Sequence, residues 1–216
     1  ILYPISYIDF SKQQQLLKPI WHEISSMISS SDNITQFMQS LGVIPNGRQG
    51  ATRQLNNNLL RICLAVDLYL RAKDRLDTLS RCAQTGIKLT VIGNGVKQYQ
   101  NQVSFHDYLD AVTAQDLLLK IRQAKAVLHN APGFIHGLHE RVIFSLANGT
   151  LVTNATPLPF IENELQETNA IVPISQLGSI DDEMYQNSQM KGFQLIAKEH
   201  TWLKRWHTLL STLNLI

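Results

Sequence analysis

The hydrophobic period of the chain changes at Gly86, and this change constrains the fold more than any other feature. Residues 1–85 carry apolar side chains at the 3.6-residue spacing of helices almost throughout. From Gly86 onward, short apolar runs alternate with amphipathic segments. Strands and helices that alternate at this spacing are typical of a parallel sheet covered on both faces. The sequence therefore predicts an α/β protein, with a Rossmann-like domain over residues 86–216 and a helical segment over residues 1–85.

Three helices are expected in the N-terminal segment. The first buries an apolar face over residues 17–28, and Asn33 caps the second. The third is long, covers residues 55–85, and carries an apolar stripe wider than the two short helices can cover. We therefore expect this segment to pack against the Rossmann-like domain. Residues 60–66 could alternatively form a buried strand, but the helical stripe continues through them without a break.

Beyond Gly86 the expected elements are short. Residues 87–92 are rich in β-branched residues and end at a tight turn, which predicts a strand. Further strands are expected at residues 126–129, 151–153 and 171–173, and residues 103–105 could form another. Two expected helices cover residues 117–125 and 138–147. A third begins with a capping box at residues 179–182, and the last places Trp202, Trp206, Leu209 and Leu213 on one face.

The composition is that of a folded protein. Hydrophobic residues make up 44% of the chain and charged residues 17%, which excludes a disordered or collagen-like chain. The 19 basic and 17 acidic residues give a net charge of +2 and form no polybasic run, which argues against a nucleic-acid partner. No apolar stretch approaches the ~18–20 residues that span a bilayer, so no transmembrane segment is expected.

Two cysteines bear on the compartment. Cys63 and Cys82 fall in the same predicted helix, roughly 28 Å apart at ~1.5 Å per residue, which is far beyond disulfide reach. Two reduced, buried thiols predict a cytoplasmic protein. The chain begins with Ile1 and not with an initiator Met, so we expect it to be part of a longer protein.

Three loops follow predicted strands, and open parallel sheets bind ligands beyond the carboxyl ends of their strands. These loops are residues 93–95, 129–141 and 154–160. In the middle loop, Gly133 and Gly137 permit a close approach of the backbone to a ligand. The helix that begins near Gly137 offers free backbone N–H groups and the positive end of its dipole, which suit a phosphate group.

Arg141 lies in the first turn of that helix and could give a diphosphate a forked pair of hydrogen bonds. Two plain alternatives stay open: Arg141 as a solvated charge, and Glu140 as a partner of the helix dipole. No metal is expected, because His136, His139 and Glu140 do not match the zinc motifs and no Asp-x-Asp is present. Residues 93–95 lack the third glycine of a dinucleotide fingerprint and could form a plain turn.

Four motifs surround the middle loop: Asn-Ala-Pro-Gly at 130–133, Gly-Leu-His-Glu-Arg-Val at 137–142, Leu-Ala-Asn-Gly at 146–149 and Leu-Val-Thr-Asn at 151–154. Together they resemble the CgeB-like (spore-maturation-type) glycosyltransferases. The helical stretch 67–75 and the stretch 200–205 are similar to further parts of that family. The resemblance extends over residues 59–212, and the Gly-Leu-His-Glu-Arg block is its most specific part. The first 55 residues resemble no family that we can name.

The resemblance implies the C-terminal, donor-binding half of a GT-B glycosyltransferase. Such an enzyme moves a sugar from a nucleotide diphosphate sugar to a hydroxyl acceptor without a metal or another cofactor. An N-terminal acceptor domain is implied outside this chain, and the acceptor stays unidentified. The implied catalytic residues are Arg141, Glu140 and His136. The implied donor-binding residues are Gly93, Asn94, Gly95, Asn130, Gly133, Gly137, Leu138, His139, Asn154 and Phe160.

One departure from the family pattern leaves a second hypothesis open. Many related retaining enzymes carry two glutamates eight positions apart, and His136 and Phe144 stand at those positions here. Glu140 is then the only carboxylate of the block. The alternative is a non-catalytic nucleotide-sugar-binding or scaffold module that keeps the fold without turnover.

Overall fold

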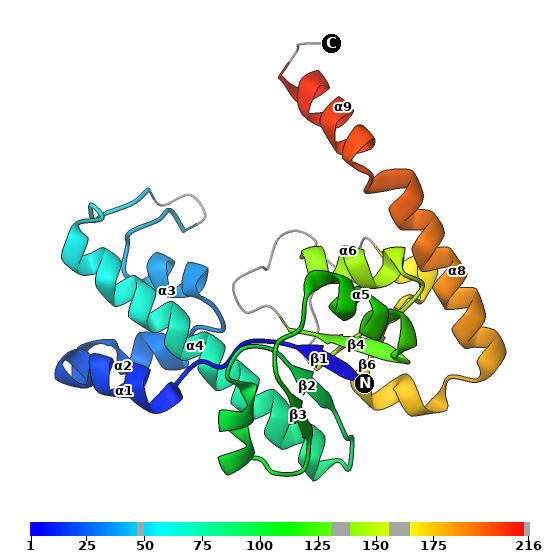
Figure 1. The fold of residues 1–216 in the computed structure, drawn as a ribbon. Helices are drawn as coiled ribbons and strands as arrows, with labels where there is room; N and C mark the ends of the chain where they lie inside the picture. The colour runs from blue at the N-terminus through cyan, green and yellow to red at the C-terminus, as the bar shows by residue number, and fades with distance from the viewer. Residues whose placement is uncertain (47–49, 131–138, 156–164, 214–216) are drawn as a thin grey trace.

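The computed structural model describes residues 1–46, 50–130, 139–155 and 165–213. The described strands form one all-parallel sheet of six strands in the order β3-β2-β1-β4-β5-β6 (Figure 1). This is the strand order of a Rossmann-like fold, so the predicted fold class is confirmed at that level. The strands span Leu2–Pro4 (β1), Thr90–Ile92 (β2), Asp107–Leu109 (β3), Ala126–His129 (β4), Leu151–Asn154 (β5) and Ile171–Pro173 (β6).

The central strand β1 comes from the start of the chain, where the sequence predicts helix. It pairs with β2 on one side and with β4 on the other. Leu2 packs with Ile121, whereas Tyr3 packs with Leu79, because successive side chains of a strand point to opposite faces. The prediction that residues 1–85 are helical is therefore wrong for β1. A short apolar run that is buried on both faces shows no strand period, so the pattern alone does not distinguish it from helix.

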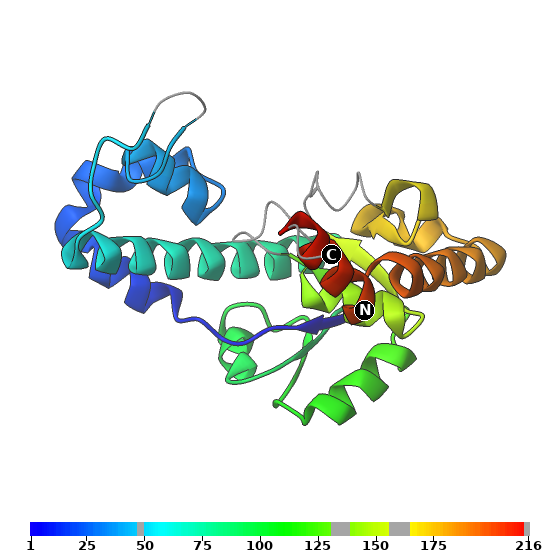
Figure 2. The same ribbon diagram turned by 90° about the horizontal axis from the view of Figure 1, so that it is seen from above.

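The described helices between residues 10 and 40, with the first half of the helix that follows them, form a helical lobe beside the sheet (Figures 1 and 2). Later helices pack on the faces of the sheet. The α-helices span Phe10–Leu17 (α1), Trp21–Ser29 (α2), Ile34–Ser40 (α3), Asn57–Gln84 (α4), Ala114–Gln123 (α5), Glu140–Ala147 (α6), Asp182–Glu199 (α8) and Trp202–Thr212 (α9). Short 3-10 helices span Lys18–Ile20 (η1), Val96–Asn101 (η2), Gln166–Thr168 (η3) and Ile174–Ser179 (η4).

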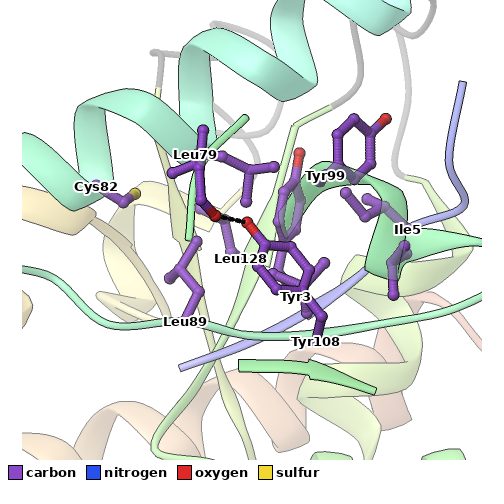
Figure 3. Packing of buried hydrophobic residues seen from close by; sticks show 11 residues of the cluster. Tyr3, Ile5, Leu79, Cys82, Leu89, Tyr99, Tyr108 and Leu128 are labelled. Carbon is purple, nitrogen blue, oxygen red and sulfur yellow. Dashed lines mark hydrogen bonds between the residues drawn. The ribbon is translucent and has the colours of Figure 1, made fainter. Parts of the chain in front are cut away.

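The long helix α4 belongs to both parts of the molecule. Its N-terminal half buries Val66 and Tyr69 against α1, α2 and α3. Its C-terminal half buries Leu79 against the sheet, and Figure 3 shows Leu79 gathered with Tyr3 and Leu128 in this cluster. The structure thus excludes a strand at residues 60–66, and the C-terminal half of α4 packs on the sheet.

Two local predictions are wrong. The strand expected at residues 103–105 is not formed, and β3 lies at Asp107–Leu109 instead. Val103 precedes β3, and its carbonyl accepts a hydrogen bond from the Tyr108 hydroxyl over 2.5 Å. The helix α8 is capped by Asp181, whose carboxylate accepts from the Met184 N–H at 2.8 Å. Ser179 ends η4 instead and donates to the Gln176 carbonyl. Both errors displace the start of an element by a few residues, and the boundaries of elements are the least predictable feature of a sequence.

Both cysteines are free and buried, as expected. In the described part of the chain, no helix is long and apolar enough to cross a bilayer. The last helix, α9, extends from α8 away from the sheet (Figure 1). Its predicted apolar face is exposed, and Trp202 keeps 86% of its surface accessible.

Candidate functional site

A cleft of about 600 Å³ lies beyond the carboxyl ends of β1 and β2. Its walls come from the residues that follow these strands, from the start of α5 and from the first turn of α6. The chain leaves β1 toward β2 but leaves β4, on the other side of β1, toward β5. Open α/β sheets bind ligands at such a switch point, where the strand order reverses. This cleft is therefore the candidate site.

The loop after β2 forms one wall of the cleft. A Cβ atom at Gly93 would lie 1.8 Å from the carbonyl oxygen of Ile5, so this close approach requires glycine. The Tyr7 N–H donates to the Asn94 carbonyl over 2.8 Å and ties the loop to the segment after β1. Of the three residues expected to border the donor, Gly93 and Asn94 line the cleft, whereas Gly95 faces the Tyr7 side chain.

His139 caps α6 and orients its first turn. The His139 Nδ1 accepts a hydrogen bond from the Arg141 N–H at 3.1 Å. Burial, followed by the nearby Arg141 charge, lowers the pKa of His139, which favours a neutral ring whose Nδ1 can accept. His139, Glu140 and Arg141 all line the cleft, so the structure brings these predicted residues together with Gly93 and Asn94.

Two arginines from distant parts of the chain line the cleft, Arg141 from α6 and Arg75 from α4. The Arg75 Nη1 donates to the Ser6 carbonyl over 2.5 Å. Burial lowers the pKa of Arg141, the buried Tyr3 opposes this shift, and the charge of Arg75 adds to it. Among the described residues, no carboxylate forms an ion pair with either guanidinium. Two such cations beside a helix N-terminus favour a bound anion.

A buried polar network lies beneath the cleft. The Tyr3 hydroxyl donates to Asn130 Oδ1 over 2.5 Å, and Asn130 Nδ2 donates to the Asp74 carboxylate. Burial raises the pKa of Asp74 to about 6. Asn130, expected to contact the donor, therefore joins β1 to α4 below the cleft.

Of the remaining predicted residues, the structure describes Asn154 alone. Asn154 lines a second cavity of about 580 Å³ with Pro173, at the ends of β5 and β6. The residues expected in the loops before α6 and after β5 lie outside the described residues; they are Gly133, His136, Gly137, Leu138 and Phe160.

The sequence predicted no specific contact for Arg75 or for His129, although His129 begins the candidate loop 129–141. Arg75 reaches the cleft through a hydrogen bond to Ser6, which lies 69 positions away in the chain. The sequence showed only that Arg75 lies in the helical stretch 67–75. Nothing in that stretch indicates that it packs beside the segment after β1. His129 ends β4 and is buried, and its position at the end of a predicted strand was the available signal.

Within the described ranges, no three His, Cys, Asp or Glu side chains gather as a metal site would need. In comparisons with known proteins, no family model, no curated protein and no solved structure matches the chain.

Proposed function

We propose that the switch-point cleft binds the diphosphate of a nucleotide sugar, and that the chain is the donor-binding part of a GT-B glycosyltransferase that works without a metal. The observation that carries the proposal is the pair of arginines, Arg141 and Arg75, in a cleft at the start of α6. A guanidinium group matches the planar, bidentate geometry of phosphate oxygens. The resemblance of the Gly-Leu-His-Glu-Arg block to the CgeB-like family supports the same assignment.

Sugar transfer requires cationic and N–H groups of the kind that line this cleft. When the bond between the sugar and the diphosphate breaks, negative charge grows on the diphosphate oxygens. Arg141, Arg75 and the positive end of α6 would stabilise that charge. Removal of one such preorganised donor typically lowers kcat about 100- to 1,000-fold.

The apolar residues of the cleft lining suit an uncharged part of the ligand. Val112 and Leu118 line the cleft, and each leaves more than a third of its surface exposed. A cleft with a cationic end and an apolar wall fits a ligand that carries both a diphosphate and an uncharged group, as a nucleotide sugar does.

Titration calorimetry of Arg141→Ala tests the proposal. A charge-assisted hydrogen bond contributes about 1.5–3 kcal/mol, so the affinity for a nucleoside diphosphate should fall about 10- to 150-fold. The melting temperature should stay nearly unchanged, because no described carboxylate pairs with Arg141. Arg122→Ala is the matched control: Arg122 lies on α5, donates to Asn148 and does not line the cleft. An Arg141→Ala protein that melts several degrees lower and binds as well as the parent would contradict the assignment.

A binding module without turnover is the second candidate. The observation in its favour is that Glu140 is the only carboxylate among the described residues that line the cleft. Chromatographic detection of nucleoside diphosphate released from the bound donor separates the two candidates. Release that depends on Arg141 supports the enzyme, whereas binding without release supports the module.

A further inference from the structure

Two buried histidines of the chain differ in their hydrogen bonding. His106 is satisfied on both ring nitrogens: Nδ1 accepts from the Leu89 N–H at 3.3 Å, and Nε2 lies 2.8 Å from the Leu79 carbonyl oxygen. His129 is only 1% exposed, yet neither of its ring nitrogens has a hydrogen-bond partner in the part of the chain that the structure describes. Buried polar groups without partners are rare in proteins and need an explanation.

The position of His129 connects it to the cleft. It ends β4, and the pairing of Leu2 with Val127 places Pro4, which lines the cleft, level with it in the neighbouring strand. The His129 and His139 ring centroids lie 5.5 Å apart. His139 and Arg141 line the cleft, so His129 lies directly behind its wall at the start of α6.

The charge state of His129 decides what it can offer. Burial, followed by the positive charge of Arg141 and then by the neighbouring His139, lowers the pKa of His129 to about 3. The ring is therefore neutral at physiological pH and carries one N–H donor and one acceptor nitrogen. A neutral donor suits a site that already holds two guanidinium groups, because it adds a hydrogen bond without further charge repulsion.

We infer that His129 contacts the ligand: its ring N–H donates a hydrogen bond to an oxygen of the anion held between Arg141 and Arg75. The anion replaces His139 Nδ1 as the acceptor of the hydrogen bond from the Arg141 N–H, since helix N–H groups bind phosphate oxygens well. The His139 ring then turns away from His129. This inference rests on the proposed function. It adds a residue that determines how far the diphosphate enters the cleft.

The experiment compares His129→Phe with His106→Phe, using inorganic pyrophosphate as the probe. Phenylalanine keeps the approximate shape of histidine but removes its polar atoms. Because the His129 ring has no hydrogen-bond partner among the described residues, His129→Phe should leave the melting temperature unchanged or raise it, and should weaken pyrophosphate binding about 10-fold or more. His106→Phe should lower the melting temperature by several degrees and leave the affinity within about twofold, since it strips two backbone groups of their partner.

A third variant and two outcomes complete the test. His129→Gln keeps an N–H donor near the same place, so it should recover part of the affinity that His129→Phe loses. The inference is overturned if His129→Phe melts as low as His106→Phe, if it binds pyrophosphate like the parent, or if the parent binds no pyrophosphate. A parent that binds pyrophosphate but no nucleotide sugar contradicts the proposed function alone.

Discussion

At the residue scale, Asp74 links the stability of the fold to pH. Its carboxylate lies beneath the cleft, accepts from Asn130, and has its pKa raised by burial to about 6. An unfolded aspartate titrates near 3.9. Between about pH 4 and pH 6 the folded state therefore holds a proton that the unfolded state has released. The free energy of unfolding falls as pH rises through this window, and the loss persists at higher pH.

The Asp74→Asn substitution should remove this pH dependence. Asparagine keeps the acceptor oxygen for Asn130 without a charge to bury. The variant should melt near the parent temperature at pH 4 and a few degrees above it at pH 7, because a shift of one pKa unit corresponds to about 1.4 kcal/mol. Melting curves of both proteins from pH 4 to pH 8 check this. Subtraction cancels the opposing contribution of His129, whose lowered pKa costs stability at low pH. A difference between the proteins that does not change with pH contradicts the account.

At the element scale, strands were predicted well where an apolar run is bounded by clear turns. Residues 126–129 and 171–173 form β4 and β6, as expected, because buried parallel strands are short and continuously apolar. The strand β1 could not be predicted, since three residues cannot show a period. Its place between β2 and β4 depends on contacts with residues about 90 and 125 positions away.

The same limit applies to the site. The loop 93–95 and the first turn of α6 could be named from the sequence, because strand ends and helix starts leave local signals. Arg75 could not, because its place in the cleft depends on a tertiary contact between α4 and Ser6, in the segment after β1. His129 begins the candidate loop 129–141, but its hydrogen bonding could not be predicted, because the sequence of a buried strand does not show whether a histidine ring has partners.

The place of β1 predicts the behaviour of a fragment of residues 86–216. Such a fragment lacks the central strand and the half of α4 that covers Tyr3 and Leu128. It would leave β2 and β4 without the strand between them, so it should aggregate and show no cooperative melting transition. Expression of the fragment, followed by gel filtration and thermal melting, tests this. A soluble fragment that melts cooperatively would show that the sheet does not need β1.

At the scale of the whole molecule, α4 connects the helical lobe to the cleft. It packs on α1, α2 and α3 at one end and on the sheet at the other (Figure 2). Its Arg75 lines the cleft. The helical lobe and the candidate site are therefore joined by one continuous helix. A substitution in the lobe that shifts α4 would move Arg75 relative to Arg141.

The most direct test of the central claim is thermal melting of the parent protein with nucleoside diphosphates of each common base, in the presence of EDTA. A ligand at 100 times its Kd stabilises the folded state by about 2.7 kcal/mol, which raises the melting temperature of a chain of this size by roughly 5–10 °C. We predict such a rise for at least one base, and its loss in Arg141→Ala. No rise with any base, a rise that EDTA abolishes, or a rise that Arg141→Ala retains would contradict a metal-independent diphosphate site in this cleft.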